Sequence, residues 1–248
     1  MRHISAKKRT HRRRKKKKYI AFLAVVFVLT GILVFLYPFV SNYFAQKQQE
    51  NVIIGQQETI QNSDEELLRE EWEKAKNYNQ TFENYMDTLN LAGDGVMGVI
   101  EIPKIELRIP IYHGSEEASL RKGIGHVKET ALPIGGLGNH TVLIGHRGLP
   151  ESELFTRLDE IEMGDRFYVS VLDKIFSYEV DQIKIVLPEE AGKIKAERNK
   201  ELITLVTCTP YGVNTHRLLV RGTRIENTKE KRPDLIKDKE ITPLTPAY

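Results

Sequence analysis

The stretch LITLVTCTPYGVNTHRLLVRGTR, Leu202–Arg224, contains two apolar runs joined by a segment that includes proline, glycine and asparagine. Apolar runs separated by turn-forming residues predict two β-strands. If the strands pair as an antiparallel hairpin, Cys208 at the end of the first faces Arg217 at the start of the second, with their backbones roughly 5 Å apart. Cys208 is the only cysteine of the chain.

Short segments with the composition of β-strands occupy much of the sequence before this hairpin. Strands are indicated in the segments 96–114, 141–148, 166–172 and 175–187, which are rich in β-branched and aromatic residues and bounded by turn signals. About seven or eight such strands indicate a mainly β protein, built as an antiparallel barrel or a sandwich.

A helical region precedes the strands. Ser63, with Glu66 three residues later, forms a capping-box pattern, and apolar residues then recur at helical spacing. This pattern predicts one or two helices over residues 63–90. Two shorter helical patches are expected between the strands, near 116–122 and 151–160.

The first 18 residues are strongly basic, with 11 of the 37 Lys and Arg of the chain and no acidic residue. A basic run can bind the phosphates of nucleic acids. The next segment, Tyr19–Val40, carries no charge, and about 20 apolar residues match the hydrocarbon core of a bilayer. Because Lys and Arg stay on the cytoplasmic side of a membrane, we expect a cytoplasmic N-terminus, an extracellular remainder and no nucleic-acid partner.

The apolar segment is longer than the core of a secretory signal peptide, which has about 7–15 residues, and it ends in Tyr-Pro-Phe instead of a small-residue cleavage site. We interpret it as a single uncleaved anchor in the plasma membrane, with a long signal peptide as the alternative. The predicted segments are, in order, a basic cytoplasmic tail (1–18), a transmembrane helix (19–40), a stalk (41–62), an N-terminal helical region (63–92), a β-barrel domain (93–226) and a charged tail that we expect to be disordered (227–248).

Cys208 is either a buried apolar side chain or a reactive group. Free cysteine is among the most buried residue types, and a single thiol cannot form an internal disulfide. A reactive thiol needs a cation or a base beside it, because only the thiolate attacks. Arg217 keeps its charge at any relevant pH. His146, which ends a strand, has the position of an acid and base, and His126 and His216 are the other candidates.

Several separate stretches resemble the sortases, which are membrane-anchored cysteine transpeptidases of Gram-positive bacteria. The similar stretches are TLVTC (204–208), IGHRGLP (144–150), THRLLVRG (215–222), GDGVMGVIEIPKI (93–105) and YHGSEEASLRKGIGHVKETALPIGG (112–136). The last two are similar to class C, the branch that assembles pili. The resemblance covers residues 63–225 and implies an eight-stranded sortase-type β-barrel with short helices.

The resemblance also implies roles for individual residues. Cys208 would be the nucleophile, His146 the general acid and base, and Arg217 the clamp for the oxyanion or the substrate. Thr207 would line the substrate pocket beside the nucleophile, whereas His126 matches a second histidine of the family and is expected to be structural. Family members cleave an LPxTG-type sorting motif between Thr and Gly through a thioester and transfer the acyl group to an amine.

Two features depart from the class C pattern. Class C sortases usually carry a lid over the active site, an inserted loop with Asp-Pro and an aromatic residue, and no such triplet precedes the expected barrel. Many also have a second transmembrane helix at the C-terminus, and residues 227–248 contain no long apolar run. The resemblance with these departures implies either a class C sortase that lacks the lid and has one anchor, or a member of a different branch of the family.

Three hypotheses about function remain open. The first is a pilus transpeptidase, whose partners are LPxTG-bearing pilins and a pilin lysine as the amine acceptor. The second is a sortase that attaches surface proteins to a peptidoglycan cross-bridge, and the third is a membrane-tethered scaffold without enzymatic activity. We expect no cofactor, and no metal because the carboxylates do not follow the spacing of a calcium loop.

Overall fold

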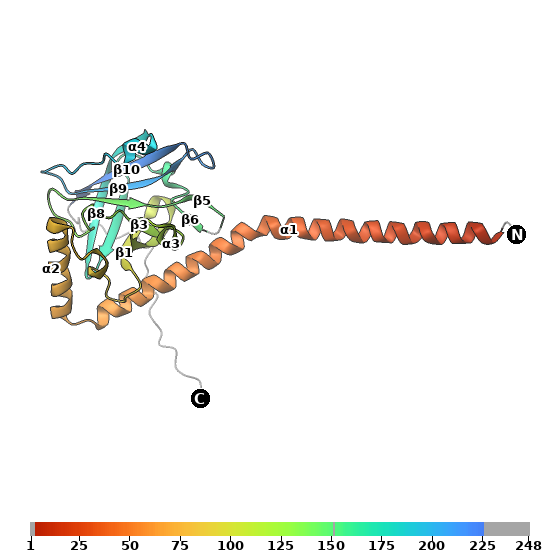
Figure 1. Ribbon diagram of the computed structural model, residues 1–248, viewed down its shortest axis with the longest axis horizontal. Coiled ribbons are helices and arrows are strands. Elements are labelled where there is room, and N and C mark those ends of the chain that lie inside the picture. The colour runs from red at the N-terminus through yellow and green to blue at the C-terminus, as the bar shows by residue number, and fades with distance from the viewer. Residues whose placement is uncertain (1–2, 151, 226–248) are drawn as a thin grey trace, which may run out of the picture.

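A long helix, α1 (His3–Asn62), leads into a closed β-barrel (Figure 1). The computed structural model describes residues 3–150 and 152–225, except for the side chains of residues 3–17. The tail predicted at 227–248 lies outside the described residues.

Eight strands close the barrel in the order β1-β2-β3-β4-β9-β10-β8-β7. Their bounds are β1 Val96–Ile102, β2 Leu107–His113, β3 Ile124–His126, β4 His140–Ile144, β7 Arg166–Val171, β8 Lys174–Val186, β9 Leu202–Thr209 and β10 His216–Ile225. Neighbouring strands are antiparallel except for β2–β3 and β4–β9, which are parallel. The predicted eight-stranded barrel, and with it the mainly β fold class, is confirmed.

Strand β9 shows how the sequence assigns its side chains to the two faces of the barrel wall. Ile203 and Leu205 belong to the hydrophobic core, and each such buried side chain stabilises the fold by about 1.5–3 kcal/mol. Because successive residues of a strand point to opposite faces, Thr204, Val206 and Cys208 lie on the outer face. The strand therefore presents its thiol away from the core.

Residues 41–62, predicted as a stalk, continue α1 as a helix and reach the barrel. Ile53 is buried, and Gln49 Nε2 donates hydrogen bonds to the Lys122 carbonyl at 3.1 Å and to Ser152 Oγ at 3.3 Å. Within the described part of the chain, Lys18–Asn62 is the one helical stretch that is long and apolar enough to cross a membrane. The helix that contains the predicted anchor thus packs against the barrel domain.

Helix α2 (Glu65–Thr81) covers another part of the barrel with an amphipathic face. Its Trp72, Ala75 and Tyr78 are buried, and Trp72 Nε1 donates to Asp173 Oδ1 at 2.8 Å. These contacts at helical spacing confirm the helix that the sequence predicts.

The N-terminal cap of α2 differs from the prediction. Asp64 is the N-cap, and its side chain accepts a hydrogen bond from the Leu67 amide at 2.7 Å. The predicted cap at Ser63 is wrong by one residue, because the Ser63 hydroxyl donates to the Thr59 carbonyl in the last turn of α1.

The short helices agree with the sequence in part. Helix α3 (Glu117–Leu120) confirms the patch near 116–122. The patch near 151–160 is largely wrong: the hairpin of β5 (Arg147–Leu149) and β6 (Ser152–Leu154) enters it, because its apolar side chains are buried against the barrel. The remaining short elements are η1 (Tyr85–Asp87), η2 (Pro103–Ile105), η3 (Leu158–Glu160) and α4 (Pro188–Ala191), of which α4 was not predicted.

His126 is fully buried at the end of β3 and holds the segment that follows α2. Its Nε2 donates to the Ala131 carbonyl at 3.0 Å, and its Nδ1 lies 2.8 Å from the Tyr85 hydroxyl. That hydroxyl also accepts from the Gly114 amide at 2.8 Å. These partners satisfy a neutral imidazole, and the structural role expected for His126 follows from them.

Burial lowers the pKa of His126 to about 4. An unfolded chain binds this proton near pH 6.5, so the free energy of unfolding should decrease as the pH falls from about 6.5 towards 4, by up to about 1.4 kcal/mol per pH unit. Burial also lowers the pKa of His140, which adds an effect of the same sign. Urea unfolding followed by the fluorescence of Trp72, the only tryptophan, should show this loss between pH 7 and pH 5. His126→Gln should have a smaller difference between the two pH values, and an identical pH dependence would contradict the assignment.

Candidate active site

Cys208 and Arg217 face each other at the open end of the hairpin that β9 and β10 form. The register pairs Cys208 with Arg217, Val206 with Leu219 and Thr204 with Arg221. Residues directly opposite in an antiparallel pair project to the same face. The cross-strand arrangement predicted for Cys208 and Arg217 is therefore confirmed, and both side chains point out of the barrel.

His146 reaches the same place through the parallel pairing of β4 with β9. The register pairs Ile144 with Val206, and the Gly145 amide donates to the Val206 carbonyl at 3.0 Å. His146 directly follows Gly145 after β4, and Cys208 lies two residues after Val206 in β9. The structure thus brings together the cysteine, the histidine and the arginine that the sequence selected.

Two side-chain hydrogen bonds bracket this meeting point. Thr207 Oγ1 donates to the Gly145 carbonyl at 2.8 Å, which joins the residue before Cys208 to the residue before His146. Arg147 Nη1 donates to Thr209 Oγ1 at 2.9 Å, which joins the residues that follow them. The spacing between the Cys208 and His146 backbones is consequently fixed on both sides.

Thr207 itself is almost completely buried, with 1% of its surface exposed. The resemblance implies that it lines the substrate pocket, and this stays a prediction. The alternation along β9 places its side chain on the face opposite to Cys208, and its hydroxyl supports the histidine loop through Gly145.

Arg147 is a residue of this region that the sequence did not single out. Its side chain is 6% exposed, and its guanidinium contacts Asp159 Oδ2, the Thr156 carbonyl and Thr209. The fork of donors on an arginine suits such a junction of several acceptors. The only signal in the sequence was its position beside His146.

The chemical groups at the pair are complementary. Cys208 is a free, half-buried thiol, and the Arg217 guanidinium donates to the carbonyls of Asn214 and His216 at 3.1 and 3.0 Å through Nη1. These bonds hold the charged group at the mouth of the hairpin. An arginine in this place can stabilise an oxyanion that forms when a thiolate attacks a carbonyl.

The other histidines lie elsewhere. His126 is buried beneath the barrel wall, and His216 pairs with Thr209 at the start of β10, where its Nδ1 lies 2.9 Å from the Thr215 hydroxyl. Among the described side chains, those of residues 18–150 and 152–225, no three His, Cys, Asp or Glu gather in a way that would hold a metal ion.

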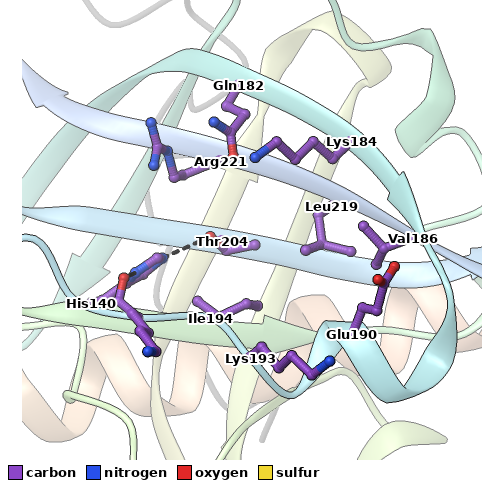
Figure 2. Close-up of a pocket in the computed structure, with 11 residues that line it drawn as sticks. His140, Gln182, Lys184, Val186, Glu190, Lys193, Ile194, Thr204, Leu219 and Arg221 are labelled. Atoms are coloured by element: carbon purple, nitrogen blue, oxygen red, sulfur yellow. Dashed lines mark hydrogen bonds between the residues drawn. The ribbon is translucent and has the colours of Figure 1, made fainter.

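A cavity of about 230 Å³ opens on the same face of the sheet as Cys208 and Arg217 (Figure 2). Besides His140 of β4, its lining residues on the strands are Thr204 of β9, Leu219 and Arg221 of β10, and Gln182, Lys184 and Val186 of β8. In the register of β8, β9 and β10, the lining residues of these three strands all project to the same face as Cys208 and Arg217. Since Thr204 is four residues from Cys208, the cavity lies roughly 13 Å from the thiol along the strand.

The segment between β8 and β9 covers this cavity with α4 and the residues after it (Figure 2). His140 joins this covering segment to strand β9 beneath it. Its Nδ1 donates to the Lys195 carbonyl at 2.8 Å, and its Nε2 lies 2.7 Å from the Thr204 hydroxyl. Ile194 of the covering segment adds an apolar surface opposite Leu219 and Val186. The result is a partly covered cavity on the face of the sheet that carries Cys208.

Comparison with known proteins agrees with this geometry. A family model described as the sortase domain matches residues 100–225, a range that contains Cys208, His146 and Arg217. Sortase A of Bacillus anthracis is 29% identical over 219 residues, which cover 88% of this chain and 99% of that protein.

Two solved structures are also similar. The crystal structure of sortase C1 from Streptococcus agalactiae has a TM-score of 0.69 and 42% identity, and the match covers 72% of this chain and 100% of the other. Sortase C of Streptococcus pneumoniae, whose structure is described in terms of catalysis and pilin substrate specificity, has a TM-score of 0.65 and 40% identity, with coverage of 71% and 96%.

The bond from Thr207 to Gly145 can be tested through stability. Thr207→Val should lower the free energy of unfolding by about 1–3 kcal/mol, because the buried Gly145 carbonyl loses its donor. Thr207→Ser keeps the hydroxyl and should lose less than Thr207→Val. Urea unfolding followed by Trp72 fluorescence compares the two variants, and equal stability of the Val and Ser proteins would show that the hydroxyl does not hold the histidine loop.

Proposed function

The chain belongs to the sortase family of cysteine transpeptidases, and we propose that it joins pilins to one another at the outer surface of the plasma membrane. In this proposal it cleaves an LPxTG-like sorting motif between Thr and Gly and transfers the threonyl acyl group to the lysine amine of a second pilin. The similarity to two class C structures and the match of the family model support the proposal.

The proposed reaction starts when the Cys208 thiolate attacks the threonine carbonyl of the motif. The carbonyl oxygen becomes an oxyanion, which the Arg217 guanidinium stabilises. His146, as the imidazolium, gives a proton to the departing glycine amine, and a thioester remains on Cys208. The acceptor amine then attacks the thioester, His146 takes its proton, and the thiolate is released.

The single observation that carries this mechanism is the pairing of Cys208 with Arg217 on the outer face of the barrel, with His146 fixed beside them by the β4–β9 register. The cavity lined by Thr204 and Leu219 lies on the same face of the sheet as this pair, and we assign it to the part of the substrate that stays on the enzyme as the thioester. Its floor is apolar at Leu219 and Val186, which suits the leucine and proline of the motif.

Attachment of surface proteins to the cell wall is the second candidate, and the similarity to a sortase A over most of both chains favours it. The chemistry at Cys208 is the same, and only the acceptor amine differs. A scaffold without enzymatic activity is not a candidate for a member of this family with a cysteine, a histidine and an arginine placed together.

The proposed location follows from α1. Its apolar stretch would cross the membrane once, with the basic residues 1–18 in the cytoplasm and the barrel outside. Because residues 41–62 continue the same helix and contact the barrel, the active site would lie close to the membrane surface, where pilins and wall precursors are both anchored.

The acceptor decides between the two candidates. The full chain in detergent micelles is supplied with a pilin that carries the sorting motif and has a reactive lysine, and in parallel with a peptide that mimics the cross-bridge amine. We expect covalent pilin ladders and slower transfer to the cross-bridge peptide, and Cys208→Ala should neither cleave nor transfer. Transfer to the cross-bridge amine alone would favour wall anchoring, and cleavage by Cys208→Ala would refute the mechanism.

We also propose that no lid covers Cys208. The segment between α2 and β1, where class C enzymes usually insert the lid, is held at the far end of β2 and β3. Glu71 accepts from the Leu89 amide at 2.9 Å, His113 Nε2 lies 2.7 Å from the Thr88 carbonyl, and Tyr85 contacts His126. Because β3 is antiparallel to β4 and β4 is parallel to β9, the C-terminal ends of β2 and β3 point to the opposite end of the sheet from Cys208.

An uncovered thiol should react with iodoacetamide in a single phase, because no gating motion precedes the reaction. Tyr85→Phe removes the hydroxyl that contacts His126 and Gly114 and so loosens the segment, and the rate should stay within about twofold of the wild-type rate if the segment covers nothing. Intact mass spectrometry follows the alkylation, and Cys208→Ala, which lacks any thiol, is the control. Two phases in the wild type, or a tenfold faster rate in Tyr85→Phe, would show that the segment is itself a cover.

A further inference from the structure

A carboxylate lies against the histidine of the site. His146 Nε2 is 3.2 Å from Glu117 Oε2, and Glu117 is the first residue of α3, the short helix between β2 and β3. The imidazole is 27% exposed, and the carboxylate is 59% exposed. The neighbouring Glu116 carries a second carboxylate at the start of the same helix.

Glu117 is held in place by a second partner. Its other oxygen, Oε1, accepts from Arg121 Nε at 2.8 Å one turn further along. The hydrogen bond to Arg121, and then the charge and hydrogen bond of His146, keep the pKa of Glu117 below its usual range. Glu117 is therefore an ionised acceptor whose free oxygen points at the imidazole.

A carboxylate only accepts hydrogen bonds, so the nitrogen that faces it carries the proton. In a neutral imidazole the other nitrogen then has the lone pair. Here the protonated atom is Nε2, and Nδ1 has no hydrogen-bond partner among the described residues. Nδ1 is consequently the nitrogen that is available to take and return a proton.

We propose that Glu117 is a positioning residue, which fixes His146 as the Nε2–H tautomer and orients the ring so that Nδ1 exchanges protons with the leaving and entering amines. The proposal rests on the role of His146 in the proposed function. Glu117 touches neither substrate nor thiol and acts through the imidazole alone.

Stability and catalysis should respond differently to the loss of this contact. Ion pairs between exposed side chains contribute little to the free energy of unfolding. An imidazole that loses its preferred tautomer spends only part of its time with the lone pair on the reacting nitrogen, and acid–base catalysis contributes about 10²–10⁴ to the rate. Glu117 should therefore affect the turnover rate and leave the fold unchanged.

The experiment compares Glu117→Ala, Glu117→Gln and the control Glu116→Ala in the full chain, with an LPxTG peptide and an amine. We expect kcat of Glu117→Ala to fall about tenfold with KM within about twofold, because only part of the acid–base term is lost. Glu117→Gln should keep kcat within about threefold, since its amide oxygen also accepts from Nε2–H. Glu116→Ala should match the wild type.

A second measurement needs no substrate. In protein labelled with ¹⁵N-histidine and held at an alkaline pH at which the imidazole is neutral, the Nε2 and Nδ1 shifts of His146, assigned by comparison with His146→Gln, should show the Nε2–H tautomer in the wild type and a mixture in Glu117→Ala. An unchanged tautomer, or an equal loss of kcat in the Ala and Gln variants, would overturn the proposal. Absence of any turnover in the wild type would count against the proposed function, while the tautomer still reports on Glu117.

Discussion

The parallel pairing of β4 with β9 is the constraint on which the site depends. It places the end of one strand, with His146, beside the end of another, with Cys208, although 62 residues separate Gly145 from Thr207 in the sequence. Thr207 and Arg147 then tie the two chain ends together on both sides of the reacting pair. A barrel wall is rigid, so the distance between thiol and imidazole is set by the fold and not by a flexible loop.

The antiparallel pairing of β9 with β10 supplies the remaining parts. One register brings Arg217 opposite Cys208 and continues the same face through Leu219 to Arg221. The proposed nucleophile and the proposed oxyanion clamp therefore share one surface of one hairpin, and the cavity that we assign to the peptide opens on the same surface. The cavity is partly covered by the segment around α4, which His140 fastens to Thr204 (Figure 2).

The sequence predicts the parts of this arrangement that depend on local pattern. Alternating apolar residues indicate the strands, and the loop length between Cys208 and Arg217 predicts their pairing. Local pattern does not say which non-adjacent strands meet, so the contacts of Arg147 with Thr209 and of Glu117 with His146 were not foreseen. The bond from Thr207 to Gly145 shows the same limit, because it joins two segments that are far apart in the sequence. The segment 151–160 was read as helical, since a short apolar patch has no period that separates a hairpin from a helix.

The central claim is that Cys208 carries the acyl group of the substrate. The most direct measurement mixes the full chain with an LPxTG peptide in the absence of an amine, stops the reaction in acid and locates the modified residue by mass spectrometry of protein fragments. The account predicts a peptide ending in threonine that is attached to the fragment with Cys208 through a bond that hydroxylamine cleaves. Cleavage of the peptide without any adduct on Cys208, or an adduct on another residue, would contradict it.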